Sequence, residues 1–236
     1  WITHQHSDHL GNAAAILERF DVKLYVDNGS RDEQRLVEAT RGAAASRGTR
    51  VAVVDPENDA CPVPGSRDLA IRAVVPKRWP ARCDGRGQND CSIGLRIDYC
   101  QTSVLFTGDA GARAEAAIDP GGPVTLLQVG HHESEASSSI AFLEKLRPKW
   151  AVISAASRDE GPNRTYCHPR GETVAALSRV LGGSRGRAVS AFDGAEKCGS
   201  DAGWSDVAAS ENLFVTARDG DVVLTSRGDG RFERSR

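Results

Sequence analysis

The chain has 236 residues and a mass of 25.2 kDa, which is enough for one large domain with a sizeable core. Apolar residues make up 39% of the sequence and charged residues 26%, a balance that excludes disordered and collagen-like chains. The formal net charge of −2 argues against a general clamp for duplex nucleic acid, although it is compatible with phosphate-bearing substrates.

The expected elements alternate between helix and strand. Apolar residues at helical spacing, among them Leu10, Leu17 and Phe20, predict a first helix over residues 9–20. In chain order, the pattern then predicts strand 22–26, helix 31–46, strands 50–54, 69–75, 93–99 and 102–107, helix 111–118, strand 123–129, helix 137–146, strand 149–154, helix 171–181, and strands 212–217 and 221–225. A turn at Asp219-Gly220 favours a hairpin made of the last two strands.

This alternation bears on fold class and domain organisation. Strands interleaved with helices and hairpins indicate an α/β sandwich with mixed sheets. No internal repeat or low-complexity linker interrupts the sequence, so we expect a single domain over residues 1–236. No apolar run approaches the roughly 18 residues of a membrane span, and the start of the chain shows no leader peptide. Because the sequence contains no Met, even at position 1, we expect a processed or truncated piece of a longer chain.

Six cysteines bear on the compartment in which the protein works. They are Cys61, Cys83, Cys91, Cys100, Cys167 and Cys198. No CxxC pair occurs, and the spacing fits no zinc finger. The even count permits three disulfides, and it favours an exported, extracytoplasmic protein with at least one bridge. A cytoplasmic protein with buried free thiols is the alternative.

The six histidines are clustered rather than scattered. Three lie within six residues, two are adjacent and one precedes a proline, whereas random placement gives roughly one per 39 positions. Clustering of this kind indicates metal ligation.

The first cluster is the string His4-Gln5-His6-Ser7-Asp8-His9. Residues 1–3 have the pattern of a strand end, and in extended backbone His4 and His6 point the same way, so they can hold one ion together. Asp8 and His9 follow at the turn into the first helix, displaced toward a second ion. Imidazole and carboxylate ligands suit zinc, manganese or iron. The alternative is that Asp8 only caps the helix while the histidines are solvated.

A second candidate ligand stands at the end of the predicted strand 102–107. Gly108-Asp109 places a carboxylate at the carboxyl edge of the sheet, where open α/β sheets bind ligands. One carboxylate with two oxygens can bridge two cations, which a dinuclear site requires. An ordinary Gly-Asp turn is the alternative.

The remaining histidines lie further along the chain. His131 and His132 follow the predicted strand 123–129, and because adjacent side chains diverge, at most one of them ligates a given ion. The other is then free to contact substrate or to transfer a proton. Two ordinary surface histidines are the alternative reading of this pair. His168, which precedes Pro169, is as compatible with a plain loop as with a functional role.

Together these elements resemble the metallo-β-lactamase-fold hydrolases. More narrowly, they resemble the soluble hydrolase domain of the competence protein ComEC and its stand-alone relatives, which include a phosphorylcholine esterase type. The matching segments follow the family's order over nearly the whole chain. They are His4 to His9, Asn89 to Ser92, Thr107 to Asp109, His131 to Ser134, Pro148 to Ser154, His168-Pro169 and the hairpin around Gly220. The resemblance implies an αββα sandwich of two mixed β-sheets flanked by helices, with its N-terminal strands missing from this chain.

The sequence departs from the family in three respects. Glu133 replaces the family's glycine after the paired histidines, which adds a carboxylate near the site. The strand-rich segment that opens the family's domain does not precede His4. No histidine precedes Asp109 outside the first cluster, so the first metal lacks the third imidazole that many relatives offer.

Residues and resemblance together predict a metal-dependent hydrolase with two divalent ions, zinc or manganese, that cleaves a phosphodiester. One ion is assigned to His4, His6 and Asp109, and the other to Asp8, His9, Asp109 and His132, with His131 as the alternative to His132. The ions would acidify a shared water to a pKa near 7. Asp8 could also orient this nucleophile, and His168 or the spare His131 could protonate the leaving oxygen.

The substrate is less well defined than the site. The resemblance implies single-stranded DNA, and a small phosphoester is equally compatible with the residues. A lactone, thioester or other ester is an alternative, because one fold hosts many reactions. A further alternative is a non-catalytic metal-binding module of a larger uptake machine, and another is a protein that stores or senses zinc.

Overall fold

The structure is a computed structural model that describes residues 1–56, 67–79, 83, 87–133, 137–194, 198–199 and 201–235. Its helices are α1 (Ser7–Leu10), α2 (Ala13–Arg19), α3 (Gln34–Ser46), α4 (Ala112–Ala117), α5 (Ile140–Leu146), α6 (Asn163–Tyr166), α7 (Gly171–Leu181) and α8 (Thr216–Asp219). Its strands are β1 (Leu24–Asp27), β2 (Arg50–Val53), β3 (Leu69–Val74), β4 (Gly94–Tyr99), β5 (Thr102–Phe106), β6 (Leu126–Gln128), β7 (Trp150–Ile153), β8 (Val189–Phe192), β9 (Trp204–Val207), β10 (Leu213–Val215), β11 (Val223–Thr225) and β12 (Glu233–Ser235). Short 3₁₀ turns cover Asn89–Cys91 (η2), Gly130–Glu133 (η3) and Asp201–Gly203 (η4).

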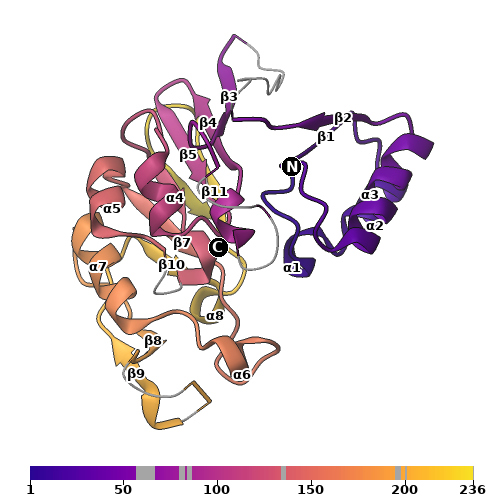
Figure 1. The fold of residues 1–236 in the computed structure, drawn as a ribbon. Helices are drawn as coiled ribbons and strands as arrows, with labels where there is room; N and C mark the ends of the chain where they lie inside the picture. The colour runs from indigo at the N-terminus through magenta and orange to yellow at the C-terminus, as the bar shows by residue number, and fades with distance from the viewer. Residues whose placement is uncertain are drawn as a thin grey trace.

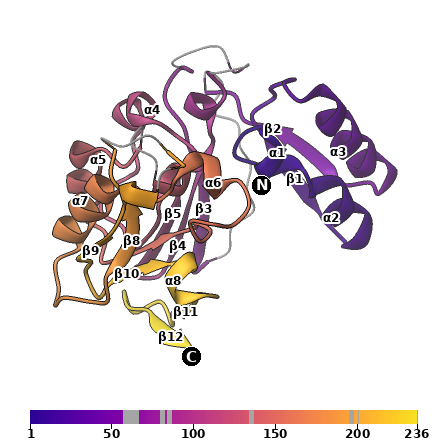
Figure 2. The ribbon, with the colours of Figure 1, turned by 90° about the horizontal axis from the view of Figure 1, so that it is seen from below.

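A six-stranded mixed sheet forms the centre of the molecule, with the strand order β10-β7-β6-β5-β4-β3. The strands from β10 to β5 run parallel, and β4 and β3 continue the sheet in antiparallel fashion. Helices α4, α5 and α7 cover one face of this sheet (Figure 1). The parallel pair β1–β2, with α2 and α3, lies on the other side of the molecule (Figures 1 and 2).

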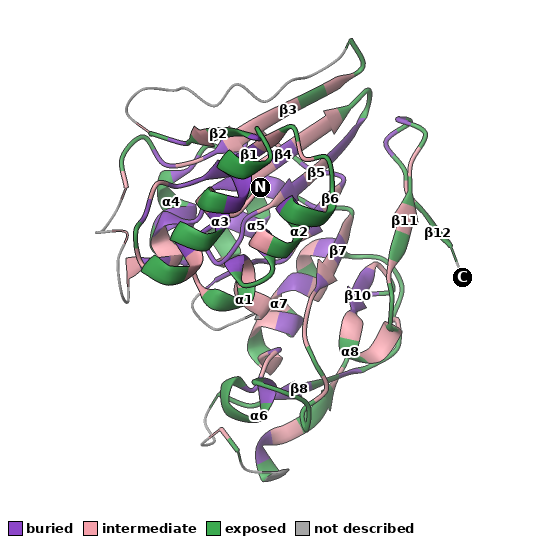
Figure 3. Ribbon diagram, turned by 90° about the vertical axis from the view of Figure 1, so that its right-hand side faces the viewer, coloured by how far each residue is buried: buried purple, intermediate pink, exposed green. Residues whose placement is uncertain are grey.

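The main core lies between the central strands and the helices that cover them. Leu105, Leu127 and Ile153, on β5, β6 and β7, are fully or almost fully buried. Leu143 of α5 and Leu177 of α7 pack into the same cluster. Buried residues gather on the central strands, whereas the outer faces of α2 and α3 are largely exposed (Figure 3). These helices hold the central strands in place, and the candidate ligands lie at the carboxyl ends of these strands.

The predicted alternation of helix and strand is confirmed, and α7 begins and ends as predicted. The first helix is broken, because Gly11 and Asn12 separate α1 from α2. Both residues are poor helix formers, and Leu10 and Leu17 pack into different apolar clusters on the two sides of the break. Residues 1–3 are not a strand, although the Ile2 amide donates to the carbonyl of Val26 in β1 at 2.9 Å.

The predicted hairpin of strands 212–217 and 221–225 is wrong. β10 pairs with β7 in parallel, and β11 pairs with β12 instead. All three residues of β10 are buried, as expected for a strand covered on both faces, whereas β11 alternates between exposed and half-buried positions. The helix α8 fills the connection that the Asp219-Gly220 turn was expected to make.

Two disulfides join described cysteines. Cys83 is bonded to Cys91, and Cys167 to Cys198, so the expectation of at least one bridge is confirmed. Cys100 is exposed and carries a free thiol, and Cys61 lies outside the described residues. Across the described ranges, no helix combines the length and the hydropathy needed to cross a membrane.

Candidate metal centre and substrate cleft

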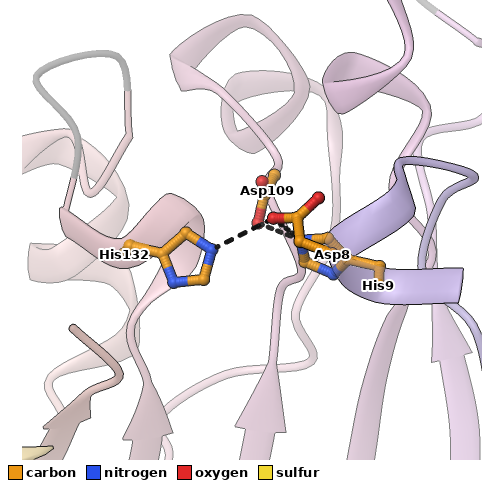
Figure 4. Close-up of side chains that lie close together, drawn as sticks. All are labelled: Asp8, His9, Asp109 and His132. Atoms are coloured by element: carbon orange, nitrogen blue, oxygen red, sulfur yellow. Dashed lines mark ion pairs between the residues drawn. The ribbon is translucent and has the colours of Figure 1, made fainter. Parts of the chain in front are cut away.

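Three strands of the large sheet end where the candidate ligands gather. Asp109 follows β5, His131 and His132 follow β6, and Ser154 follows β7. These strands run parallel, so their carboxyl ends meet at one edge and the segments after them converge. Figure 4 shows Asp109 and His132 from this edge pointing toward Asp8 and His9, which come from α1.

Two glycines allow these segments to approach closely. Gly108 has a φ of +58°, and a Cβ there would lie 2.7 Å from the Cβ of Thr3, the residue before His4. A Cβ on Gly130 would lie 2.7 Å from the hydroxyl of Thr107. Real Cβ atoms do not tolerate such distances, so glycine is required at both positions.

The first ligand group consists of His4, His6 and Asp109. The ligand atoms of these three residues all lie within 4.8 Å of one another. His4 Nε2 is 3.0 Å from His6 Nδ1 and 3.8 Å from Asp109 Oδ2, and the His4 side chain is fully buried. The sequence prediction placed the same three residues around one ion.

The second ligand group consists of Asp8, His9, Asp109 and His132, again within 4.8 Å (Figure 4). His9 Nε2 lies 3.3 Å from Asp109 Oδ1 and 3.4 Å from Asp8 Oδ2. His132 Nε2 lies 3.8 Å from Asp8 Oδ2. These four residues are the ones that the sequence assigned to the second ion.

Asp109 belongs to both groups, and its two oxygens face different partners. Oδ2 is the oxygen near His4, whereas Oδ1 is the oxygen near His9. The carboxylate is 94% buried, so its orientation is set by the protein and not by solvent. This is the geometry that a carboxylate bridging two cations requires.

Neighbouring polar groups orient the ligands from behind. The Ser92 hydroxyl accepts a hydrogen bond from the backbone N–H of Asp109 at 3.1 Å. The same hydroxyl lies 3.4 Å from His4 Nδ1, and the Thr3 hydroxyl lies 3.1 Å from that nitrogen. His132 Nδ1 donates to the Ser154 carbonyl at 2.8 Å, which leaves Nε2 free to face the cluster. Such outer contacts fix the tautomer and the ring orientation of metal-binding histidines.

The protonation states follow from burial and from the neighbouring charges. Burial, reinforced by the nearby His9, lowers the pKa of His4 to about 3, so its ring is neutral at pH 7. The rings of His132 and His9, whose Nε2 atoms lie 3.8 and 3.4 Å from Asp8 Oδ2, hold the pKa of Asp8 well below its usual range. Burial lowers the pKa of His9, but the carboxylates of Asp109 and Asp8 outweigh that effect and raise it to about 9. Burial likewise opposes ionisation of Asp109, and His9 outweighs it, which brings the pKa of Asp109 to about 2.

These residues fit divalent cations. All the ligand atoms are imidazole nitrogens or carboxylate oxygens, the set that suits zinc and manganese. The Nε2 atom of His9 is buried and makes no hydrogen bond, although two carboxylates lie near it. In the absence of an ion, a proton on His9 balances these carboxylates, and a cation can take over that role.

His131 and His132 stand on unusual backbone. Both have positive φ, 49° and 53°, a left-handed conformation that non-glycine residues seldom adopt. As a result both rings face the cleft and diverge: His132 lies toward Asp8, whereas His131 Nε2 lies 3.3 Å from the Asn89 amide and 4.0 Å from Asp109 Oδ2. The choice between them as ligand stays a prediction, although His132 is the one that belongs to the second ligand group.

The ligand cluster opens into a cleft of about 550 Å³. Besides the cluster, it is lined by Glu33, Asn89, Ser154, Ala155, Ala156, Pro162, Asn163, Tyr166 and His168. Its size lies within the range of about 300–1,000 Å³ that holds ligands much larger than a phosphate ion. Glu133 is the last residue of η3, and Ser134, the last residue of the matched segment 131–134, lies outside the described residues.

His168 reaches the cleft through the support of Asn163. The buried Asn163 side chain donates to the carbonyls of Ala156 and His168 at 2.8 and 2.7 Å, and it accepts the N–H of His168 at 2.7 Å. The His168 ring centroid lies 6.1 Å from that of His131 and 6.4 Å from that of His132. Burial, reinforced by both histidines, lowers the pKa of His168 to about 4, so the ring is neutral at pH 7.

Some residues of this site were not singled out from the sequence. Asn163 and Tyr166 lie in a segment read as a loop, and no residue pattern could have marked them. Asn89 and Ser92 were matched to the family but given no role. The contact that assigns a role to Ser92, its bond to the Asp109 amide, joins residues 17 positions apart and is visible only in the fold.

Comparisons with known proteins identify the family of this chain. A family model described as "Metallo-beta-lactamase superfamily" matches residues 1–157. ComE operon protein 3 of Bacillus subtilis is 29% identical over 182 residues, which cover 75% of this chain and 22% of that protein. Recombination protein 2 of Haemophilus influenzae is 41% identical over 71 residues, which cover 30% of this chain and 9% of that protein. The chain therefore matches about a fifth or less of the length of these relatives.

A solved structure is also similar. The short form of human tRNase Z has 10% identity and a TM-score of 0.39, over 76% of this chain and 67% of that chain. The family model covers more than half of the chain, including the histidine string, Asp109 and the paired histidines. The fold is the metallo-β-lactamase fold, as the resemblance implied, and the chain belongs to the metallo-beta-lactamase superfamily.

Proposed function

We propose that this chain is a dinuclear metal-dependent hydrolase that cleaves phosphodiesters. Members of its superfamily are typically hydrolases. The observation that carries the proposal is the placement of Asp109, whose two oxygens face two separate groups of ligands. A site for a single ion would need only one group of ligands, and no carboxylate would be shared between two groups.

The groups of residues named above would hold one ion each. The chemistry that such a pair of cations supplies is a water acidified to a pKa near 7 and neutralisation of charge on the phosphoryl oxygens. The protein supplies the orientation of the reacting groups. The Asp8 carboxylate is 59% exposed toward the cleft and stays ionised, so it can accept a hydrogen bond from the nucleophile and aim it.

His168 and His131 would contact the other end of the reacting group. Burial lowers the pKa of both rings, so each is neutral at pH 7 and can donate one N–H without carrying an extra proton. We therefore assign His168 to hydrogen bonding with a phosphoryl or leaving oxygen. Asn163 fixes the backbone of His168 on both sides and so determines where the ring lies.

Phosphodiesters are favoured over lactones and thioesters by the charge of the site. Two divalent cations outweigh the two carboxylates of Asp8 and Asp109, so the loaded site carries a positive charge that attracts an anionic substrate. A neutral lactone gains nothing from this charge before it reacts. Single-stranded DNA and small phosphodiesters both satisfy the argument.

The proposal is tested by metal content and by turnover in matched variants. Purified protein should hold two zinc or manganese ions per chain and should hydrolyse bis(p-nitrophenyl) phosphate. Asp109→Ala should lose the activity and at least one ion, and Asp8→Ala should lose the activity, with circular dichroism unchanged. Asp21→Ala, whose carboxylate is exposed and outside the cleft, is the control and should behave like the wild type.

Three outcomes would contradict the proposal, each in a different part. Full activity in either variant would show that the ligands are misassigned. Metal content well below one ion per chain would instead identify a non-catalytic module. Preferential turnover of a lactone or thioester would keep the metal site and correct the substrate.

We also infer that the protein works outside the cytoplasm. Two disulfides among the described cysteines are typical of oxidising compartments. If the protein is alkylated in intact native cells before lysis, mass spectrometry should find Cys83, Cys91, Cys167 and Cys198 unmodified. Alkylation of all four would place the protein in a reducing compartment.

A further inference from the structure

The wall of the cleft away from the ligand cluster carries an exposed aromatic side chain. Tyr166, the last residue of α6, lines the cleft and is 60% exposed. The small apolar residues Pro162, Ala155 and Ala156 line the same cleft.

The backbone on both sides of Tyr166 is tied to the rest of the protein. Its N–H donates to the Pro162 carbonyl at 3.1 Å. The next residue, Cys167, is buried and bonded to Cys198, and Asn163 anchors the start of the same turn. The backbone that carries the ring is therefore held in a fixed turn at the wall of the cleft.

Tyr166 also lies in line with the histidines of the site. Its ring is within 4° of parallel to that of His168, with centroids 6.1 Å apart. His168 is in turn 6.1 Å from His131 and 6.4 Å from His132. Tyr166 and the ligand cluster line the same cleft, so a flat group of a substrate can rest on Tyr166 while its phosphate lies at the cluster.

We propose that Tyr166 is a stacking platform for the nucleobase next to the scissile phosphodiester. This inference rests on the proposed function and names its substrate as a nucleotide ester. An aromatic face stacks on any base, because every base presents a π-face. The cleft also holds an unpaired acceptor, since the Asn89 Oδ1 atom is buried with no hydrogen-bond partner. A phosphodiester has no donor to offer this atom, whereas a base or a sugar does.

Two substrates that differ by one nucleoside test the proposal. They are the p-nitrophenyl ester of thymidine 5′-monophosphate and methyl p-nitrophenyl phosphate. Tyr166→Ala should raise KM for the thymidine ester about 5- to 150-fold, because the stacking of one base is lost. The KM for the methyl ester should not change. Tyr166→Phe should keep the wild-type KM for both esters. Tyr99→Ala removes an exposed tyrosine outside the cleft and is the matched control.

A binding measurement without metal separates this inference from the proposed function. In EDTA, fluorescence anisotropy compares a labelled oligothymidylate with the same strand lacking its bases. The wild type should bind the strand with bases at least fivefold more tightly, and Tyr166→Ala should show no preference. If this preference is found but neither ester is hydrolysed, the proposed function fails and the stacking platform stands.

The opposite result overturns the platform alone. If the thymidine ester is hydrolysed and Tyr166→Ala changes neither its KM nor the binding preference, Tyr166 does not stack on a base. Tyr166→Leu, which keeps an apolar side chain, replaces Tyr166→Ala if the alanine variant fails to fold. It should lose the base preference in the same way, because leucine has no π-face.

Discussion

The disulfide between Cys167 and Cys198 offers the clearest test of how the cleft wall is held. The bridge spans 31 residues and closes a loop that contains α7 and β8. Removing it with Cys167→Ser and Cys198→Ser frees that loop in the unfolded chain. Loop-closure entropy for this length corresponds to about 3.7 kcal/mol of stability. The 8-residue bridge from Cys83 to Cys91 corresponds to about 2.5 kcal/mol by the same relation.

The assay is urea unfolding in metal-free, non-reducing buffer, so that bound ions do not mask the difference. The Cys167/Cys198 double variant should lose about 3–4 kcal/mol, which corresponds to a fall in Tm of about 6–16 °C for a chain of this size. Wild-type protein treated with a reductant should lose more, because both bridges open. Tyr166 and His168 flank Cys167, so the double variant should also have a higher KM while it is still folded. A free energy of unfolding within 0.5 kcal/mol of the wild type would refute the loop argument.

Four further experiments follow, three on the candidate metal centre and one on the carboxylate of Asp219. Ser92→Ala removes the hydroxyl that accepts the Asp109 amide and should weaken zinc binding about 10- to 100-fold in a chelator competition, with the exposed Ser190→Ala as control. The pKa of His9 is raised to about 9, so zinc binding at pH 7.5 should release about one proton. Calorimetry in buffers of different ionisation enthalpy measures this release, and a result of no release would contradict the raised pKa. In EDTA the same raised pKa stabilises the fold fully below pH 6.5, and urea unfolding should show that contribution disappear as the pH rises through 9. Asp219→Ala removes a carboxylate that is 2% exposed and paired with Arg187, Arg218 and Arg234, of which Arg187 is 68% exposed, so unfolding should be easier by about 1–2 kcal/mol; a loss under about 0.5 kcal/mol would refute a structural role.

The ligand set could be predicted because its members lie where sequence patterns are easiest to interpret. His4 to His9 form one short string, and Asp109 and His132 each follow an apolar strand. The ends of parallel strands meet at one edge, which explains the proximity of Asp109 and His132, whereas the placement of His4 to His9 beside them was implied by the family resemblance. The backbone geometry of the paired histidines did not follow, because a left-handed conformation at two adjacent non-glycine residues leaves no sequence signal.

The parts that escaped prediction are short or depend on distant partners. The helix α6 has four residues, fewer than a helical period needs to show, so Asn163 and Tyr166 could not be placed. The pair β8–β9 is joined through residues 193–203, a connection longer than the roughly two to five residues of a typical hairpin loop. At the C-terminus the Asp219-Gly220 turn suggested a hairpin, but the wholly apolar β10 instead pairs with β7 at one end of the large sheet, where all three of its residues are buried.

Gly108 and Gly130 have a consequence for anyone who wishes to move this centre to another scaffold. The backbone of Gly108 lies so close to the side chain of Thr3 that no methyl group fits between them. This close contact sets the spacing between the N-terminal histidines and Asp109. If the ligands alone were transferred to another scaffold, the distance between the N-terminal histidines and Asp109 would therefore be too large. Gly108→Ala should therefore push the N-terminal histidines and Asp109 apart, although no coordinating residue is changed.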